Sequence, residues 1–428
     1  MMKWIICSLS LFSVVTVKAQ SISVSPYSAY GVGEQLFDNN TEQAGMGGIS
    51  TVPTNPYGQS ANFANPAANQ NLRMTTFNAS GSGTNYSFKS GTDKENAGRF
   101  NVSNISLAFP VGEKGSFGLG FQPYSALGYD IMTTSERNNI KQNVQMKGDG
   151  GLNSIHAFYS RNLTKEFSLG LRVNYLFGEL KRNEILAVEG ASLAVDYSDK
   201  SNYRGAQFTL GSMYTKKIGK THNLNLGATY TLGTNLRTDV TDLTTTYSYI
   251  GTTQSSLDTI SIIRVDNGKT KIPQMFTLGA SYSKDNTWSL AIEAKYNNWK
   301  DFSQPLEGQN STMSSSVDYK NNVRLAVGGY WIPDYNSYKS YFNRVTYRAG
   351  MYYQSAQYSI HGTDIDSYGA TLGFGFPIGK QSDGSMMNIS LEYGQKGKTT
   401  NNLIKENYFG VKVGFDINDI WFRKRVID

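Results

Sequence analysis

Fourteen short segments of this chain alternate apolar and polar residues, and tight connections alternate with long ones between them. A strand that faces lipid on one side and a polar lumen on the other has a side-chain period of two. Each segment is long enough for a tilted membrane span of roughly 9–11 residues. The pattern therefore predicts an all-β fold, namely a 14-stranded antiparallel transmembrane β-barrel.

The connections between the expected strands also indicate an orientation. Those after the second, fourth, sixth and eighth strands are tight, as in 162–164, whereas those after the third, fifth, seventh and ninth are long and polar. Short periplasmic turns and long outer loops place both chain ends in the periplasm. The alternative is a soluble β-sandwich, which seldom keeps this phase over so many hairpins. The expected strands are 72–86, 101–109, 115–124, 152–160, 166–178, 205–215, 222–232, 274–283, 287–297, 322–331, 344–353, 366–376, 386–394 and 407–417.

The first nineteen residues have the features of a secretory signal peptide. Lys3 precedes an apolar run over 4–17, and Val17-Lys18-Ala19 provides a small-residue cleavage site, so Gln20 is the expected first mature residue. The single cysteine, Cys7, lies inside the signal, so we expect no thiol chemistry and no disulfide in the mature chain. No later segment is apolar over twenty residues, as a spanning helix would require.

Charge and aromatic content indicate which classes of partner to expect. The net charge of +7 includes Lys3 and Lys18 of the signal, whose removal leaves +5. This excess is spread out apart from Arg423-Lys424-Arg425, so nucleic acid is not an expected partner, while outer-membrane lipids and anionic lipopolysaccharide are. The 28 Tyr and 21 Phe residues suit aromatic girdles at two membrane interfaces.

Residues 20–71 do not alternate and are rich in Gly, Asn, Ser and Pro, which suits a disordered tail, a periplasmic appendage or a lumenal plug. Three motifs then carry a family resemblance: 44–49 followed by 65–68, the third-strand motif 117–124, and the hairpin 272–302 with its Trp-x-x-Phe end. Together they resemble the FadL/TodX (OMPP1-like) family of outer-membrane transporters for hydrophobic compounds, in its Bacteroidetes branch. Together with the signal and the strand pattern, the resemblance divides the chain into four expected parts: signal peptide 1–19, hatch 20–71, barrel 72–418 and periplasmic tail 419–428.

The resemblance also implies a function, an outer-membrane channel for uptake of hydrophobic or amphipathic, fatty-acid-like molecules. Cargo would leave sideways into the bilayer through an interruption of the third strand near Gly118, Gly120 and Pro123, although these residues could instead make room for the plug and mark the strand end. The same branch includes a type IX secretion carrier protein. The alternative is therefore a non-transporting, plugged barrel that serves as a scaffold or accessory subunit of a secretion or biogenesis complex. The hatch residues implied by the family are Gly45, Gly47, Gly48, Asn65, Pro66 and Ala67.

Strand parity places a set of charged side chains in the lumen, because a charge on the lipid face costs roughly 2–4 kcal/mol near the bilayer midplane. Such charges form either an ion-pair network that holds the plug or a substrate contact, and lumenal charges usually pair first. Parity also turns small residues of 366–376 inward, where the plug can approach. The inward charges are Glu293, Lys295, Arg324, Arg348 and Glu392.

Few inward positions are apolar, so the candidates for ligand contact are limited. Parity turns Phe158 and Met275 inward. Further candidates lie in the expected outer loops, where they either cap an apolar groove or simply extend the strands. They are Leu127, Ile131 and Met132 in the second loop and Ile185, Leu186 and Val188 in the third.

The three histidines do not indicate an enzyme. Ser154 and His156 share the inward face of one strand, away from a bilayer substrate and without an evident orienting carboxylate. His361, near Asp364 and Asp366, matches no closed metal site. His222 begins a strand as an interface residue. We therefore expect no catalytic activity, no metal and no cofactor.

Overall fold

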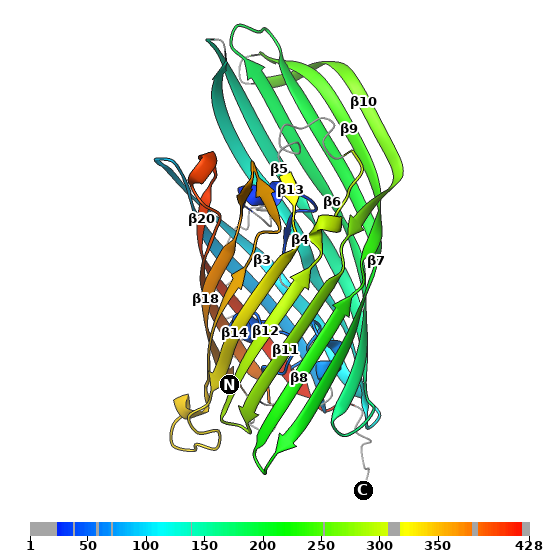
Figure 1. Ribbon diagram of the computed structural model, residues 1–428, viewed down its shortest axis with the longest axis vertical. Coiled ribbons are helices and arrows are strands. Elements are labelled where there is room, and N and C mark those ends of the chain that lie inside the picture. Colours follow the sequence, from blue (N-terminus) through cyan, green and yellow to red (C-terminus); the bar gives the residue numbers. More distant parts are fainter. Residues whose placement is uncertain are drawn as a thin grey trace, which may run out of the picture.

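The computed structural model describes residues 24–36, 39–56, 60–69, 72–137, 139–250, 253–306, 317–378 and 384–421. The expected signal peptide and residues 422–428 of the expected tail lie outside this part. The described strands form one antiparallel sheet that closes into a barrel, plus a small three-stranded sheet (Figure 1). Within the described part, no helix is both long and apolar enough to cross a membrane.

The main sheet has seventeen strand segments, sixteen of which make up the fourteen strands of the barrel. β1 belongs to the N-terminal part of the chain, and β8 with β9, like β10 with β11, makes one strand interrupted by a break. The barrel strands are β2 (Thr75–Ser90), β3 (Asp93–Val111), β4 (Gly115–Arg137), β5 (Ile140–Asn162), β6 (Phe167–Val188), β7 (Ala194–Ile218), β8 (His222–Thr231), β9 (Thr234–Ile250), β10 (Thr253–Ile272), β11 (Met275–Lys284), β12 (Trp288–Asn297), β14 (Asn322–Trp331), β15 (Thr346–Gln354), β18 (Ser367–Pro377), β19 (Met386–Lys396) and β20 (Lys405–Asp419).

Pairing of the first and last barrel strands closes the ring. β2 pairs with β20 from Thr75–Asp419 to Lys89–Lys405, and every other barrel strand pairs with its neighbours in chain order. The predicted closed barrel of fourteen antiparallel strands is therefore confirmed.

The remaining elements are short. Two 3-10 turns, one helical turn and β1 lie in residues 24–69, whose described part we call the N-terminal segment. The blue part of Figure 1 shows it among the strands. These elements are η1 (Pro26–Ala29), β1 (Glu34–Gln35), α2 (Thr41–Ala44) and η2 (Pro66–Asn69); the others are η3 (Trp299–Asp301), β13 (Val317–Tyr319), η5 (Phe342–Arg344), β16 (Tyr358–Ile360), β17 (Thr363–Asp364) and η7 (Thr400–Asn402).

The period of two decides which side chains face outward. On β12, Leu290 and Ile292 are 63% and 60% exposed, whereas Ala291 and Glu293 are 3% and 4% exposed. The same alternation on the other strands surrounds the barrel with an exposed apolar band. Residues on this band include Leu169, Leu210, Leu226, Leu278, Leu325, Leu372 and Phe409.

The prediction of long outer loops after the third, fifth and seventh strands is wrong, because the strands continue through these stretches. β4, β5, β6, β7, β9 and β10 rise beyond the rest of the barrel as one sheet, which we call the extension (Figure 1). Next to the barrel its inner face still buries alternate side chains, whereas 130–136 of β4 and 258–269 of β10 bury none. Leu127, Leu152 and Leu180 form an apolar core there with Ala29 and Val32 of the N-terminal segment.

Candidate functional site

Glu293 on β12 binds the backbone of the N-terminal segment. Its Oε2 accepts hydrogen bonds from the Ser50 and Thr51 backbone N–H groups and from Thr51 Oγ1, each at 2.7 Å. The carboxylate is almost completely buried. Because hydrogen bonds to a charged acceptor are the stronger kind, this residue fixes Ser50 and Thr51 against the wall.

The inward arginines contact the same segment. Arg324 Nη2 donates to the Gly47 carbonyl at 2.6 Å, and its guanidinium lies 4.5 Å from the centre of the Tyr352 ring. Arg348 Nη2 lies 3.8 Å from Glu42 Oε2, with both side chains buried. These positive groups therefore hold α2 and the glycine turn that follows it.

Glu392 and Lys295 lie further from these backbone bonds. Glu392 accepts a hydrogen bond from the Tyr352 hydroxyl, and Lys295 is paired across strands with Arg324. Both line the lumenal cavity described below. All five inward charges thus lie in the barrel interior or on its cavity wall.

Other wall residues hold the segment although the sequence analysis did not single them out. Arg172 Nη1 donates to the Phe63 carbonyl at 2.7 Å, and Lys412 Nζ donates to the Asn39 carbonyl at 2.6 Å. Both occupy inward positions of the alternating pattern, so the parity rule that selected Glu293 also applies to them.

The family-implied hatch residues lie in close contact with the wall. The Gly47 N–H donates to Thr371 Oγ1 at 2.8 Å, and a Cβ placed on Gly350 would lie 2.3 Å from the Gly47 nitrogen. Gly47 and Gly48 have φ of +70° and +77°, which favours glycine. Gly45 lies against Gly373 in the same way, so the turn seats directly on β15 and β18.

The Asn-Pro-Ala part of the motif lies on another wall. Asn65 Nδ2 donates to the Thr51 carbonyl at 2.7 Å and to the Ser212 carbonyl at 3.2 Å. Its Oδ1 accepts from the Ala67 N–H, and Pro66 begins η2 beside β6 and β7. This motif therefore joins two parts of the N-terminal segment to the barrel.

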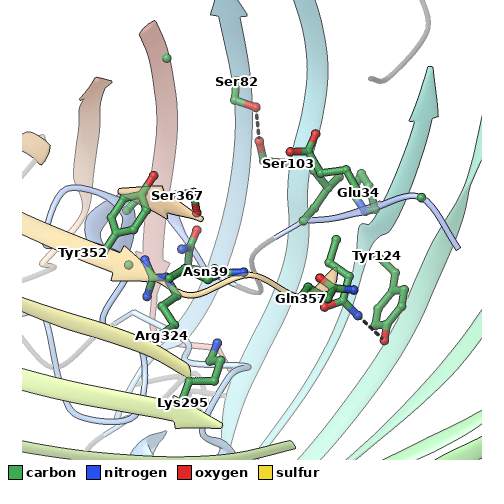
Figure 2. A pocket seen from close by; sticks show the side chains of 18 of the residues that line it. Glu34, Asn39, Ser82, Ser103, Tyr124, Lys295, Arg324, Tyr352, Gln357 and Ser367 are labelled. Carbon is green, nitrogen blue, oxygen red and sulfur yellow. Dashed lines mark hydrogen bonds between the residues drawn. The ribbon is translucent and has the colours of Figure 1, made fainter. Parts of the chain in front are cut away.

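A cavity of about 290 Å³ lies in the lumen between the N-terminal segment and the wall (Figure 2). Met275 and several aromatic rings line it together with many polar side chains, and cations outnumber anions. Such a mixed wall suits an amphipathic or anionic ligand better than a purely aliphatic one. The charged lining residues are Glu34, Arg99, Arg172, Lys295, Arg324, Glu392, Lys396 and Lys412.

The other apolar candidates are used in packing. Leu127 is fully buried in the apolar core of the extension, and Phe158 packs edge-to-face on Phe63 with ring centres 5.0 Å apart. Ile185, Leu186 and Val188, like Ile131 and Met132, belong to strands rather than to loops. The half-buried side chains 185–188 therefore extend β6.

The expected interruption between β4 and a neighbour near the N-terminal segment is present, but it lies beyond Gly118 and Gly120. β4 pairs without a break with β3 from Gly115 to Phe121, and with β5 from Gly115 to Pro123. A Cβ on Gly118 would lie 2.3 Å from the Phe158 ring, and one on Gly120 would lie 2.4 Å from the His156 ring. These glycines make room for rings on β5.

An opening between β3 and β4 begins after Phe121. The β3–β4 ladder ends at Ile105–Phe121, and we call the opening beyond this pair the seam. The N-terminal segment lies in it: the Leu36 N–H donates to the Tyr124 carbonyl at 3.0 Å, and Glu34 and Gln35 pair with Ala126 and Ser125. β1 therefore occupies the edge of β4 that β3 leaves.

An ionic clasp holds β1 in the seam. Glu34 Oε2 lies 3.5 Å from Arg99 Nη1 on β3, and Glu34 Oε1 lies 3.2 Å from Lys396 Nζ on β19. Figure 2 shows Glu34 beside Ser103 and Tyr124, on the cavity side of the seam. Pro123 lies at this place too, where the β4–β5 register shifts before Ser125.

The histidines form no recognisable catalytic or metal site. His156 is buried with its ring centre 4.5 Å from that of Phe63, and His222 stacks on Tyr282. His361 lies in a turn, where Asp364 pairs with Lys320 instead. Within the described residues, no cluster of His, Cys, Asp and Glu could hold a metal ion.

Comparison with known proteins gives a family and a fold. A family model described as BamG matches residues 1–428. No curated protein matches the chain. Solved structures of similar fold include the P. putida toluene transporter TodX (17% identity, TM-score 0.63), the Ralstonia pickettii toluene transporter TbuX (14%, 0.58) and a Pseudomonas aeruginosa FadL homologue (15%, 0.58). Each alignment covers 90% of this chain and 99% of the other.

Proposed function

The chain belongs to the BamG family, and on this premise we propose that it is an outer-membrane barrel, closed by its N-terminal segment, that acts as an accessory subunit of a larger secretion or biogenesis assembly. The name of the family, BamG, favours an accessory role over a transport role. The segment 20–71 is then a structural hatch, held in place rather than moved by a cargo.

The surface of the barrel supports the proposed outer-membrane location. The exposed apolar band would cost free energy in water, at roughly 25 cal/mol per Å², and suits contact with lipid chains. We propose lipids of the outer membrane, including lipopolysaccharide, as its surroundings, and other outer-membrane subunits as its partners.

The observation that carries the accessory role is the occupied lumen. Glu293, Arg324 and Arg172 are each used by backbone groups of the N-terminal segment. The apolar side chains inside the extension are used as a packed core. A passage for an apolar molecule would require many of these buried bonds to break together, each leaving a polar group unpaired at about 1–3 kcal/mol.

A second candidate is an uptake channel for hydrophobic or amphipathic molecules. One observation favours it: the seam beside β4 is closed by β1 rather than by a barrel strand. If residues 28–36 left this edge, the cavity would open sideways toward the bilayer. The fold shared with the toluene transporters TodX and TbuX suits the same candidate.

A disulfide that locks the hatch separates the two candidates. Residues 35 and 125 lie opposite each other in the β1–β4 pair, at a spacing that a disulfide can bridge. The double variant Gln35→Cys/Ser125→Cys, which ties β1 to β4, should keep its partners and support cells that make no other copy, whether oxidised or reduced. Activity that returns only on reduction would instead establish the channel. The two single cysteine variants are the controls.

A further inference from the structure

The extension has two free edges, and the structure treats them differently. Its strand order is β4-β5-β6-β7-β9-β10, so β4 and β10 are the outer strands (Figure 1). A free edge exposes backbone N–H and C=O groups that can pair with another chain, and soluble and membrane proteins usually protect such edges.

The β10 edge is protected. Its ladder with β9 shifts register at three places, between Ser256 and Asp258, Thr259 and Ser261, and Val265 and Gly268. Exposed charged side chains follow at Arg264, Asp266 and Lys269. Bulges and charges are the usual devices against strand addition.

The β4 edge lacks the bulges, although it too carries charged residues, namely Asp130, Glu136 and Arg137. From Ser125 to Arg137 its ladder with β5 runs without a register shift, and residues 129–137 contain neither Pro nor Gly. Instead this stretch includes Tyr129, Ile131 and Thr133, residue types that favour strands. The edge is therefore straight and rich in strand-forming residues.

The first part of this edge already accepts a strand. Beyond the β1 pairs, the Gly128 N–H donates to Ser28 Oγ at 3.0 Å, and Ser28 Oγ lies 3.2 Å from the Gly128 carbonyl. The N-terminal segment then turns away, since Ser25 Oγ donates to Glu406 on β20. Within the described residues, no strand pairs with this side of β4 beyond Gly128.

The period of two places further backbone groups on the same edge. Because the N–H and C=O of Gly128 point to it, those of Asp130, Met132 and Thr134 point to it too. The side chains of Tyr129 and Ile131 adjoin the apolar core of the extension, whereas Met132 is 71% exposed on the other face.

We propose that residues 129–137 of β4 bind an extended segment of a partner polypeptide, which adds to the sheet as a further strand. Alternate residues of that segment would be apolar, to cover Tyr129 and Ile131, and the others polar. The inference rests on the proposed accessory role, for which it supplies a docking surface.

Amide hydrogen exchange tests the proposal on the assembly purified from native membranes and on the barrel alone. The amides of Asp130, Met132 and Thr134 should exchange at least ~10-fold more slowly in the assembly. Equal rates in an intact assembly would overturn the edge proposal and leave the accessory role standing. Failure to isolate any assembly would overturn the accessory role itself.

Slow exchange of these amides already in the barrel alone would also overturn the proposal, because this chain's own upstream residues would then cover the edge.

A backbone variant tests the same edge independently. Thr134→Pro removes one edge N–H and leaves the β5 ladder in place, whereas Thr134→Val keeps the N–H and changes the side chain. Thr134→Pro should reduce recovery of the partner by ~10-fold or more, and Thr134→Val should not. Both barrels should still migrate as folded species in unheated gels. Full recovery with a folded Thr134→Pro barrel would overturn the proposal.

Discussion

Residues 39–69 and residues 24–36 of the N-terminal segment differ in how deeply the contacts that hold them are buried. The first stretch combines hydrogen bonds from its backbone to buried charges, such as Glu293 and Arg324, with two apolar clusters that include Met46, Ile49 and Phe63. The second is held by an apolar core that includes Val32, by two residue pairs with β4 and by the partly exposed Glu34 clasp. A partly exposed ion pair contributes less to stability than a buried charge that accepts several hydrogen bonds. The comparison predicts that the first stretch is rigid and that the second is the easier one to release.

The largest effect is expected for Glu293→Ala. Three donors of Ser50 and Thr51 would lose their acceptor, so the free energy of unfolding should fall by about 3–5 kcal/mol. Denaturant titration in detergent micelles measures it. Glu293→Gln keeps one acceptor oxygen and should lose about half as much. A loss below ~1 kcal/mol for Glu293→Ala would remove the claimed rigidity of residues 39–69.

Gly350→Ala tests the same stretch by crowding. The new Cβ would lie 2.3 Å from the Gly47 nitrogen, so backbone must shift, and the unfolding free energy should fall by about 1–3 kcal/mol. Gly83→Ala is the matched control, because its nearest neighbour would lie 3.8 Å away, and it should change stability by less than ~0.5 kcal/mol. Equal effects of the two variants would show that the glycine turn does not seat on β15.

Glu34→Gln should lower the free energy of unfolding by less, about 1–2 kcal/mol, because the partners Arg99 and Lys396 keep 12% and 18% side-chain exposure. Amides of residues 28–36 should exchange faster while those of 39–56 do not. Asp130→Asn is the control, because its pair with Lys147 is about half exposed and should contribute little. Faster exchange in both stretches would mean that they move as one unit.

The smallest effect concerns Asp199, on β7 above the apolar band. Burial raises the pKa of this carboxyl above 3.8, although Arg182 opposes the shift. A raised folded-state pKa means that the contribution of Asp199 to stability is greatest at low pH and declines as pH rises through the raised value. Unfolding titrations of the protein and of Asp199→Asn should therefore differ increasingly with rising pH. A constant difference would contradict the raised pKa. Because Arg182 also donates to the Ala29 and Gly31 carbonyls, residues 24–36 should not be released.

The barrel could be predicted because parity is a local property of sequence. Leu290, Ala291, Ile292 and Glu293 alternate in sequence as they do in exposure. Strand length was harder to predict. Leu127 and Leu180 lie in stretches whose composition resembles loops, and the apolar core that they share with Val32 forms only in the fold.

The contacts of the inward charges were not predictable in the same way. Parity places Glu293 and Arg324 inside, but their partners are backbone atoms of Ser50, Thr51 and Gly47, which no residue pattern specifies. β1 has two residues, too few for any period, so the occupied seam had no sequence signal. Gly118 and Gly120 suggested a gap, whereas the structure uses them to admit neighbouring rings.

The pairing of β2 with β20 sets an order of events in biogenesis. Most strands pair with a neighbour that is close in sequence, but Thr75 can pair only after Asp419 has been synthesised. Closing so long a loop is entropically demanding and slow compared with hairpin formation. The N-terminal segment, synthesised first, is bound by Ser25 to Glu406 and by Asn39 to Lys412, both on the last strand. The earliest residues therefore reach their final place only when the latest ones arrive, and a chain arrested before β20 would present its N-terminal segment unenclosed.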